Sequence, residues 1–444
     1  MALRYSLELG LRGLRRHPRT TALAVLLLGM GLAAVMSMLT LLAMLSSDPL
    51  PGVSGRLYQA WVDSRPAPTS REALEPDEGG PPFLWKLADA EAMMSLQPAI
   101  RQAALVSTLL TLSTPGGERN HSSLGVLATG PMPAMFGVPL RRGRFWTAGE
   151  ERERAPVAVI SEDVARELFP GGDALGREVQ VGNGAFRIIG ITGEWAPRPR
   201  FHFLPPGQAP WDGGTDSVFL PLRAALGAGV APVSARDCDG RGSGGLGFDG
   251  IDLQACRWLA LWAELPDDAA HAAYADALAG LASARHQAGV FERPPASRLD
   301  SVPEWLGANR VVPDSVHLNL WLAGGLLALC MVNVAGLLAA RFLRRGGELG
   351  VRRVLGAPRR SVVMQCLAEA GAVGLLGGLL ALPLTLFGLW LIRLQDHGYT
   401  DLARFDTGLF LVLCALSIII GLLVGLVPAL RAARIEPVLQ VKSL

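Results

Sequence analysis

The sequence predicts an integral membrane α-helical protein with four transmembrane helices and a large α+β extracytoplasmic domain of two subdomains. Half of the 444 residues are hydrophobic and the mean hydropathy is +0.32, which is high for a soluble chain. The apolar residues gather in one block near the start and three near the end, and the region between them has the composition of a water-soluble domain. Arginines flank the apolar blocks, and their placement predicts the orientation of the chain.

An amphipathic cytoplasmic helix is predicted for residues 1–19. Leucines recur there at helical spacing, at Leu3, Leu7, Leu11 and Leu14, with charged residues between them. Such a helix lies in the membrane interface with its apolar face toward the lipid. Pro18 is expected to end it before the chain enters the membrane.

Each apolar block is long enough to cross a bilayer, which takes about 20 apolar residues in a helix. We expect spans at residues 20–45, 317–341, 361–393 and 408–430. The first block is longer than the apolar stretch of a signal peptide, about 7–15 residues, and no A-x-A site follows it. The first span is therefore predicted to be a retained anchor.

Small residues recur at four-residue spacing within three of these spans. The pairs are Gly29 and Ala33, Gly374 and Gly378, and Gly421 and Gly425. Such pairs let helix backbones approach closely. Two interpretations remain open at this point, packing within one protomer and a seam between two protomers.

Arginine placement predicts the side of the membrane on which each connection lies. Five arginines precede the first span, seven lie between residues 341 and 360, and Arg431, Arg434 and Lys442 follow the fourth span. Segments 1–19, 342–360 and 431–444 are therefore predicted to be cytoplasmic, with both termini inside. The large domain at 46–316 and the short loop at 394–407 are then predicted to be extracytoplasmic.

The large domain alternates strand and helix patterns. The clearest segment places a buried strand at 157–160, a helix at 162–168 with Ser161 as its N-cap, and a hairpin about Gly182-Asn183-Gly184. A second strand-and-helix unit is predicted at 258–264 and 267–284. At about 270 residues the region is large enough for two subdomains, and we expect this second unit to pair with the first part of the domain.

The large domain contains only two cysteines, Cys238 and Cys256, and they flank a glycine-rich loop at 240–250. In an oxidising compartment a disulfide between them would close that loop. The alternative is two unpaired thiols.

Several chemistries are not supported by any motif. The sequence has no G-x-x-x-x-G-K-[ST] loop, no H-E-x-x-H and no G-x-S-x-G, so we predict neither a catalytic nor a metal site, and we expect no directly bound cofactor. The net charge of only +2 gives no basic field for nucleic acid. The seven histidines are scattered, and His202, which lies among prolines, is predicted to occupy a surface loop.

The cytoplasmic segment between the second and third spans carries the most specific motif. It reads ELGVRRVLGAPRR from Glu348 to Arg360 and continues as SVVMQCLAEA into the third span. This run resembles the signature of the FtsX-like permease family, to which the MacB-type transport proteins belong. The matching positions are Glu348, Gly350, Arg352, Arg353, Gly356, Ala357 and Glu369, and the match is looser at Val354 and Pro358.

Other segments resemble the same family in the expected order. They are the start at LRGLRRHPRTTALAVLLLGMGLA, the run PVAVISEDVARELFPGGDALGREVQVGNGAFRIIGI, the turn GRFW, and the tail PALRAARIEPVLQVKSL. The resemblance therefore covers the chain from end to end apart from the glycine-rich loop.

The resemblance implies a permease subunit of an ABC transporter in the bacterial inner (cytoplasmic) membrane. In that family a separate ATPase uses ATP and Mg²⁺, and its motion passes through the permease to the periplasmic domain (mechanotransmission). The ATPase-coupling residues implied here are Glu348, Gly350, Arg352, Arg353, Gly356, Ala357, Arg359 and Arg360. Implied partners are the ABC ATPase, a second permease copy or paralogue, membrane lipids, and a periplasmic adaptor with an outer-membrane duct.

The resemblance leaves the cargo open. Efflux or export of a peptide, antibiotic or similar cargo is the leading hypothesis. The alternatives are lipoprotein or lipid extraction, as in the LolC and LolE members, and an FtsX-like signalling subunit that controls a cell-wall hydrolase.

Overall fold

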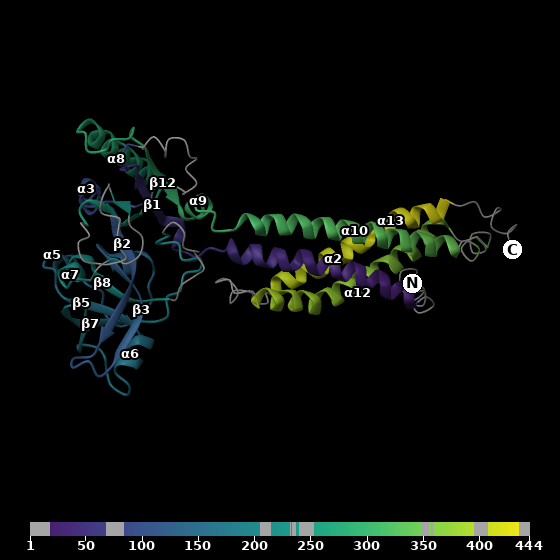
Figure 1. Cartoon of the computed structure of the whole chain (residues 1–444). Coiled ribbons are helices and arrows are strands. Elements are labelled where there is room, and N and C mark those ends of the chain that lie inside the picture. Colours follow the sequence, from purple (N-terminus) through teal and green to yellow (C-terminus); the bar gives the residue numbers. More distant parts are fainter. Residues whose placement is uncertain are drawn as a thin grey trace. The chain divides into compact units, whose positions relative to one another are not determined.

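The computed structural model describes residues 18–67, 84–204, 215–230, 232, 237–238, 253–345, 347, 355–356, 358–394 and 407–434 (Figure 1). The chain forms two compact units, a helical unit of Met1–Ser46 and Val312–Leu444 and an α/β domain of Ser47–Val311. The predicted N-terminal amphipathic helix falls almost entirely outside the described residues, as do most of the loop at 394–407 and of the tail at 431–444.

The α/β domain is built on one ten-stranded sheet in the order β12-β1-β11-β2-β3-β8-β5-β7-β4, with β6 pairing with both β2 and β7. Its strands are β1 (Leu57–Val62), β2 (Arg101–Ser113), β3 (Asn120–Ala128), β4 (Leu140–Gly143), β5 (Val157–Ser161), β6 (Glu178–Val181), β7 (Gly184–Thr192), β8 (Asp216–Pro221), β11 (Ala260–Glu264) and β12 (Ser297–Ser301). Strands β9 (Asp237–Cys238) and β10 (Cys256–Arg257) form a separate pair.

The long strand β2 makes the predicted two subdomains parts of one sheet. Its first residues, Arg101 to Leu105, pair with β11, and its remainder pairs with β3 from Leu105 to Ser113. The expected pairing of the second unit with the first part of the domain is therefore confirmed, because β11 pairs with both β1 and β2. A strand of 13 residues, nine of them buried, is long enough to carry partners from both parts of the sequence.

The strand-and-helix patterns of the sequence are confirmed. Ser161 accepts a hydrogen bond from the Val164 N–H at 3.3 Å and caps α6. The hairpin of β6 and β7 turns at Gly182, whose φ is +58°. The helices of the domain are η1 (Ser54–Arg56, a 3₁₀ turn), α3 (Leu87–Leu96), α4 (Met132–Met135), α5 (Ala148–Arg152), α6 (Glu162–Leu168), α7 (Leu222–Gly227), α8 (Asp268–Gln287) and α9 (Val302–Ala308).

The helical unit contains α2 (Pro18–Leu45), α10 (Asp314–Arg344), α12 (Arg359–Arg393) and α13 (Thr407–Arg434). Among the described residues, three helices, α2, α10 and α12, are long and apolar enough to cross a membrane. In α13 the apolar stretch found is shorter, Ala415–Arg431. The structure therefore supports three of the four predicted spans by length and composition.

The small residues of the helical unit pack against one another within a single chain. A Cβ on Gly378 would meet the Ser417 side chain of α13, and one on Gly425 would lie 2.1 Å from the Ala370 Cβ of α12. In α2, a Cβ on Gly29 would lie 3.2 Å from the Gly377 carbonyl oxygen. Of the two interpretations of these glycines, packing within one protomer is the one seen in the structure.

Candidate coupling site

The candidate site is the predicted coupling segment, residues 342–360, which runs from the end of α10 to the start of α12. The structure describes three of the predicted ATPase-coupling residues, Gly356, Arg359 and Arg360. The other five, Glu348, Gly350, Arg352, Arg353 and Ala357, lie outside the described residues. Their roles therefore stay predictions.

Gly356 has a left-handed backbone conformation, with φ at +96°. Glycine adopts that conformation without the steric cost that a Cβ imposes. Pro358 lies directly before α12, and its carbonyl accepts a hydrogen bond from the Ser361 N–H at 2.9 Å. A proline suits the first turn of a helix, where the N–H has no helical partner. Gly356 and Pro358 thus set the start of α12.

The first turns of α12 present two different faces. Arg359 and Arg360 are exposed, whereas Val362, Cys366 and Glu369 are buried at three- and four-residue spacing. Because α12 is unbroken from Arg359 into its apolar stretch, the end of the candidate site is a rigid extension of that helix.

A buried ion cluster lies where α12 meets α10. The Glu369 carboxylate is 2.5 Å from an Arg341 guanidinium nitrogen and 3.4 Å from one of Arg345. The Glu369 side chain is 3% exposed and that of Arg341 is 6% exposed. Arg341 also donates a hydrogen bond to the hydroxyl oxygen of Thr21 on α2, at 3.1 Å. The cluster therefore joins three helices.

Sequence reasoning did not identify this cluster. Glu369 appeared only as a match to the family signature. The signal available was a lone carboxylate in an apolar helix, which calls for a charged partner. The sequence did not identify Arg341 as this partner, because Arg341 also fits the pattern of cytoplasmic arginines.

The α/β domain holds a second buried polar cluster, about His202 and Asp216. His202 Nε2 lies 2.9 Å from Asp216 Oδ2, and Arg200 lies 3.1 Å from Asp216 Oδ1. Ser107 donates to the same Oδ1 atom at 2.8 Å. The prediction that His202 occupies a surface loop is wrong, because its side chain is fully buried.

The aromatic core explains the burial of His202. The Trp262 indole donates to the backbone carbonyl of His202, and the Trp305 indole donates to that of Phe201, each at 2.9 Å. These bonds satisfy the backbone carbonyls of the segment where it is buried inside the domain. Burial lowers the pKa of the His202 imidazole. Burial alone would raise the pKa of Asp216, but the facing His202 and Arg200 hold that pKa below its usual value.

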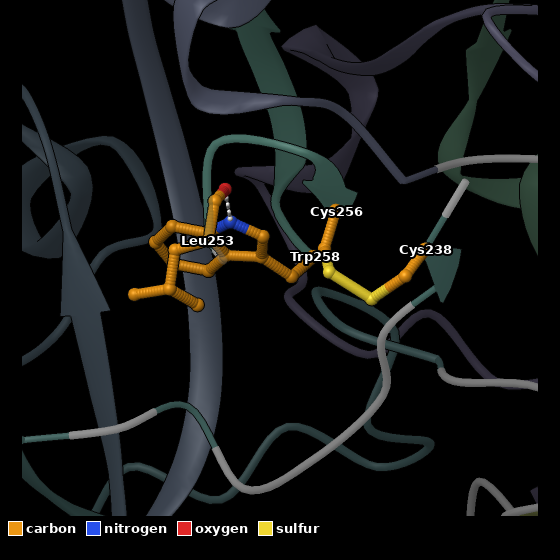
Figure 2. The surroundings of a disulfide bond; sticks show 4 residues. All are labelled: Cys238, Leu253, Cys256 and Trp258. Carbon is orange, nitrogen blue, oxygen red and sulfur yellow. Dashed lines mark hydrogen bonds between the residues drawn. A yellow bond between two sulfur atoms is a disulfide. The ribbon is translucent and has the colours of Figure 1, made fainter. Parts of the chain in front are cut away.

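Cys238 and Cys256 are joined by a disulfide in the structure, across the pair of strands β9 and β10 (Figure 2). The bridge closes a loop with a sequence separation of 18 residues. Two residues beyond it, the Trp258 indole donates to the Leu253 carbonyl at 2.9 Å (Figure 2). This contact and the disulfide hold the chain at the start of β11.

Two family models match the chain. The model described as the MacB-like periplasmic core domain matches residues 21–281, more than half of the chain. The model described as the FtsX-like permease C-terminal region matches residues 321–437. The second match includes most of α10, the candidate coupling site, α12 and α13.

The chain is also similar to proteins named macrolide export ATP-binding/permease protein MacB. The protein of Rhodospirillum rubrum is 26% identical over 446 residues, covering 99% of this chain and 60% of that protein. The protein of Azoarcus sp. is 27% identical over 309 residues, covering 69% of this chain and 40% of that protein. The chain thus spans about 40 to 60% of the length of these relatives.

Two solved structures show a likeness to the chain. The periplasmic region of MacB from Actinobacillus actinomycetemcomitans has 14% sequence identity and a TM-score of 0.34, covering 57% of this chain and 94% of that one. The extracellular domain of the transporter YknZ from Gram-positive bacteria has 11% identity and a TM-score of 0.35, covering 55% of this chain and 99% of that one. With the family models matching both parts of the sequence, the chain belongs to the MacB-type family of FtsX-like ABC transporter permeases.

Proposed function

We propose that the chain is the permease subunit that couples ATP hydrolysis by an ABC ATPase to movement of its α/β domain. The observation that carries the proposal is the FtsX-like permease match over residues 321–437, which contains the arginine-rich segment between α10 and α12. The 444 residues contain no phosphate-binding P-loop, so ATP is hydrolysed by a domain outside them.

The proposed topology has four spans, with both termini and residues 342–360 in the cytoplasm of a bacterium. Arginine placement supports it, because arginines concentrate before α2, between α10 and α12 and after α13. The helix α13 is 28 residues long, enough for the fourth span in helical form. The α/β domain then lies outside the cytoplasmic membrane, where its disulfide is stable.

The connectivity of the chain supports a mechanical role. Helix α2 ends at Leu45, directly before the α/β domain, and α10 begins at Asp314, directly after it. The domain is therefore held by two helices of the helical unit. A push on the segment between α10 and α12 has a continuous helical path to the domain.

The proposed activity is efflux or export of a peptide, antibiotic or similar cargo, working with a second permease copy or paralogue. The names of the relatives, which describe macrolide export, support this cargo class. A periplasmic adaptor and an outer-membrane duct complete the proposed pathway.

Affinity purification of the full chain from its native membranes tests the proposal. Mild crosslinking followed by mass spectrometry should recover an ABC ATPase as a major partner. Recovery of a cell-wall hydrolase in place of an efflux adaptor would contradict the export role. Recovery of a second permease copy would show that the complex stays intact during purification. If no ABC ATPase were found in such a sample, the proposed function itself would be contradicted.

A further inference from the structure

The ion cluster of Glu369, Arg341 and Arg345 is costly to maintain in an apolar helix bundle. A charge at this position loses its hydration and is retained where it is paired or functional. A buried ion pair adds little net stability over apolar residues of similar size, but it fixes the register of the groups that it joins. The cluster therefore fixes the register of α12 against α10 at this point.

The position of the cluster relates it to the candidate coupling site. Arg341 lies three residues before the end of α10, and Glu369 lies ten residues after the start of α12. The first turns of α12 thus form an arm of about 15 Å between the coupling site and the cluster. Along that arm Val362 and Cys366 are buried on the same face as Glu369.

The third contact of the cluster reaches α2. Arg341 donates to Thr21, which lies in the first turn of α2 and is 9% exposed. Helices α2 and α10 are the two helices that lead into and out of the α/β domain. The cluster therefore ties the arm of α12 to the two helices that lead into and out of that domain, at their ends farther along the chain from it.

We infer that Glu369, Arg341 and Arg345 form the joint that transmits a displacement of the coupling segment to α2, α10 and α12 together. These are positioning residues, and the inference rests on the proposed function. Without the joint, α12 slides against α10 and the displacement is not passed on. With it, the three helices move as one body.

The test uses the full chain and its ABC ATPase in lipid nanodiscs. Spin labels are attached through unnatural amino acids at two exposed positions, Arg152 on α5 and Leu322 on α10. The distance between the labels is measured by pulsed electron paramagnetic resonance without nucleotide and with trapped ATP. Binding of the ATPase is measured on the same samples.

Glu369→Gln should bind the ATPase normally and lose most of the nucleotide-dependent change in the distance between the labels. Arg341→Lys, which keeps the charge, should retain most of the change. Thr385→Val is the matched control, because Thr385 is a buried polar residue elsewhere on α12. Its change should stay within about twofold of wild type.

A second variant covers the case in which Glu369→Gln does not fold. In Arg341→Met/Glu369→Met the pair is replaced by apolar side chains of similar length, which leaves no unpaired carboxylate. This variant should fold and bind the ATPase but lose the change in distance. A wild-type change in distance in either variant overturns the inference, whereas failure of wild-type chain to bind an ATPase overturns the proposed function.

Discussion

Gly374 of α12 and Gly421 of α13 bring the backbones of their helices into direct contact. A Cβ on Gly374 would lie 2.9 Å from the Gly421 Cα, and a Cβ on Gly421 would lie 2.7 Å from the Gly374 Cα. Both approaches are closer than real Cβ atoms make. The crossing of α12 and α13 therefore depends on the absence of a side chain at both positions.

Gly374→Leu should destabilise the helical unit by about 1–3 kcal/mol, because overpacking forces the two helices apart. Thermal unfolding in detergent measures the effect. Gly336→Leu on α10 is the matched control, since a Cβ there meets nothing within 4 Å. Equal midpoint temperatures of unfolding for the Gly374→Leu and Gly336→Leu variants would contradict the close crossing of α12 and α13.

Arg154→Gly should stabilise the α/β domain by about 0.5–1 kcal/mol. Arg154 follows α5 with a φ of +55°, a conformation that costs a non-glycine residue free energy. Chemical denaturation of the intact chain, followed by tryptophan fluorescence, measures the change. Arg152→Gly, inside α5, should be neutral or destabilising. The account of strain at Arg154 fails if its glycine variant is the less stable one.

The disulfide between Cys238 and Cys256 should be present in protein purified from its native compartment. Alkylation in denaturant without reductant, followed by mass spectrometry, should modify Cys330 and Cys366, which have no disulfide partner, and spare Cys238 and Cys256. Detection of both of the latter as alkylated thiols would contradict the bridge. Its removal by Cys238→Ser/Cys256→Ser should cost about 3 kcal/mol for a loop of this length.

The α/β domain should lose stability as the pH falls from 7 to 5, and His202 should account for part of the loss. Its pKa is lowered from 6.5 in the folded chain, so below that pH the unfolded chain binds a proton that the folded chain does not. The stability that this group contributes is thus present above about pH 6.5 and lost below it. Asp216, whose pKa is also lowered, loses its contribution only as the pH falls below 3.8.

His202→Gln should reduce the loss of stability between pH 7 and 5, because glutamine donates to Asp216 but does not titrate. Denaturation at the two pH values, followed by the fluorescence of Trp195 beside His202, measures it. Phe201→Leu is the control. It should lower stability at both pH values and leave the difference unchanged. If the difference in stability between pH 7 and 5 is the same in His202→Gln as in wild type, His202 does not cause part of the loss.

Local patterns predicted the elements of the α/β domain well. The cap at Ser161 and the hairpin at Gly182 depend on residues close in the chain, so their signals were visible in the sequence. The burial of His202 was not visible, because the carbonyls of its segment are satisfied by Trp262 and Trp305, which lie 60 and 104 residues away.

The candidate site also combines features that were visible in the sequence with features that were not. Gly356 matches the family signature, and the structure has a left-handed Gly356 just before α12. The pairing of Glu369 with Arg341 was not predicted, since charge patterns place arginines near a membrane face without naming their partners. The small-residue pairs indicated close helix contacts, but the same sequence pattern fits a contact within one chain and a contact between two chains.

The central claim is that residues 342–360 dock an ABC ATPase. The binding affinity of that ATPase for the chain in nanodiscs tests this claim most directly. We predict that Arg352→Glu/Arg353→Glu abolishes binding, because two charges on the docking segment are reversed, while the variant chain inserts and unfolds like wild type. Arg142→Glu/Asp173→Arg, which reverses an exposed ion pair of the α/β domain, should bind like wild type. Unchanged affinity of the ATPase for the Arg352→Glu/Arg353→Glu chain would contradict the account.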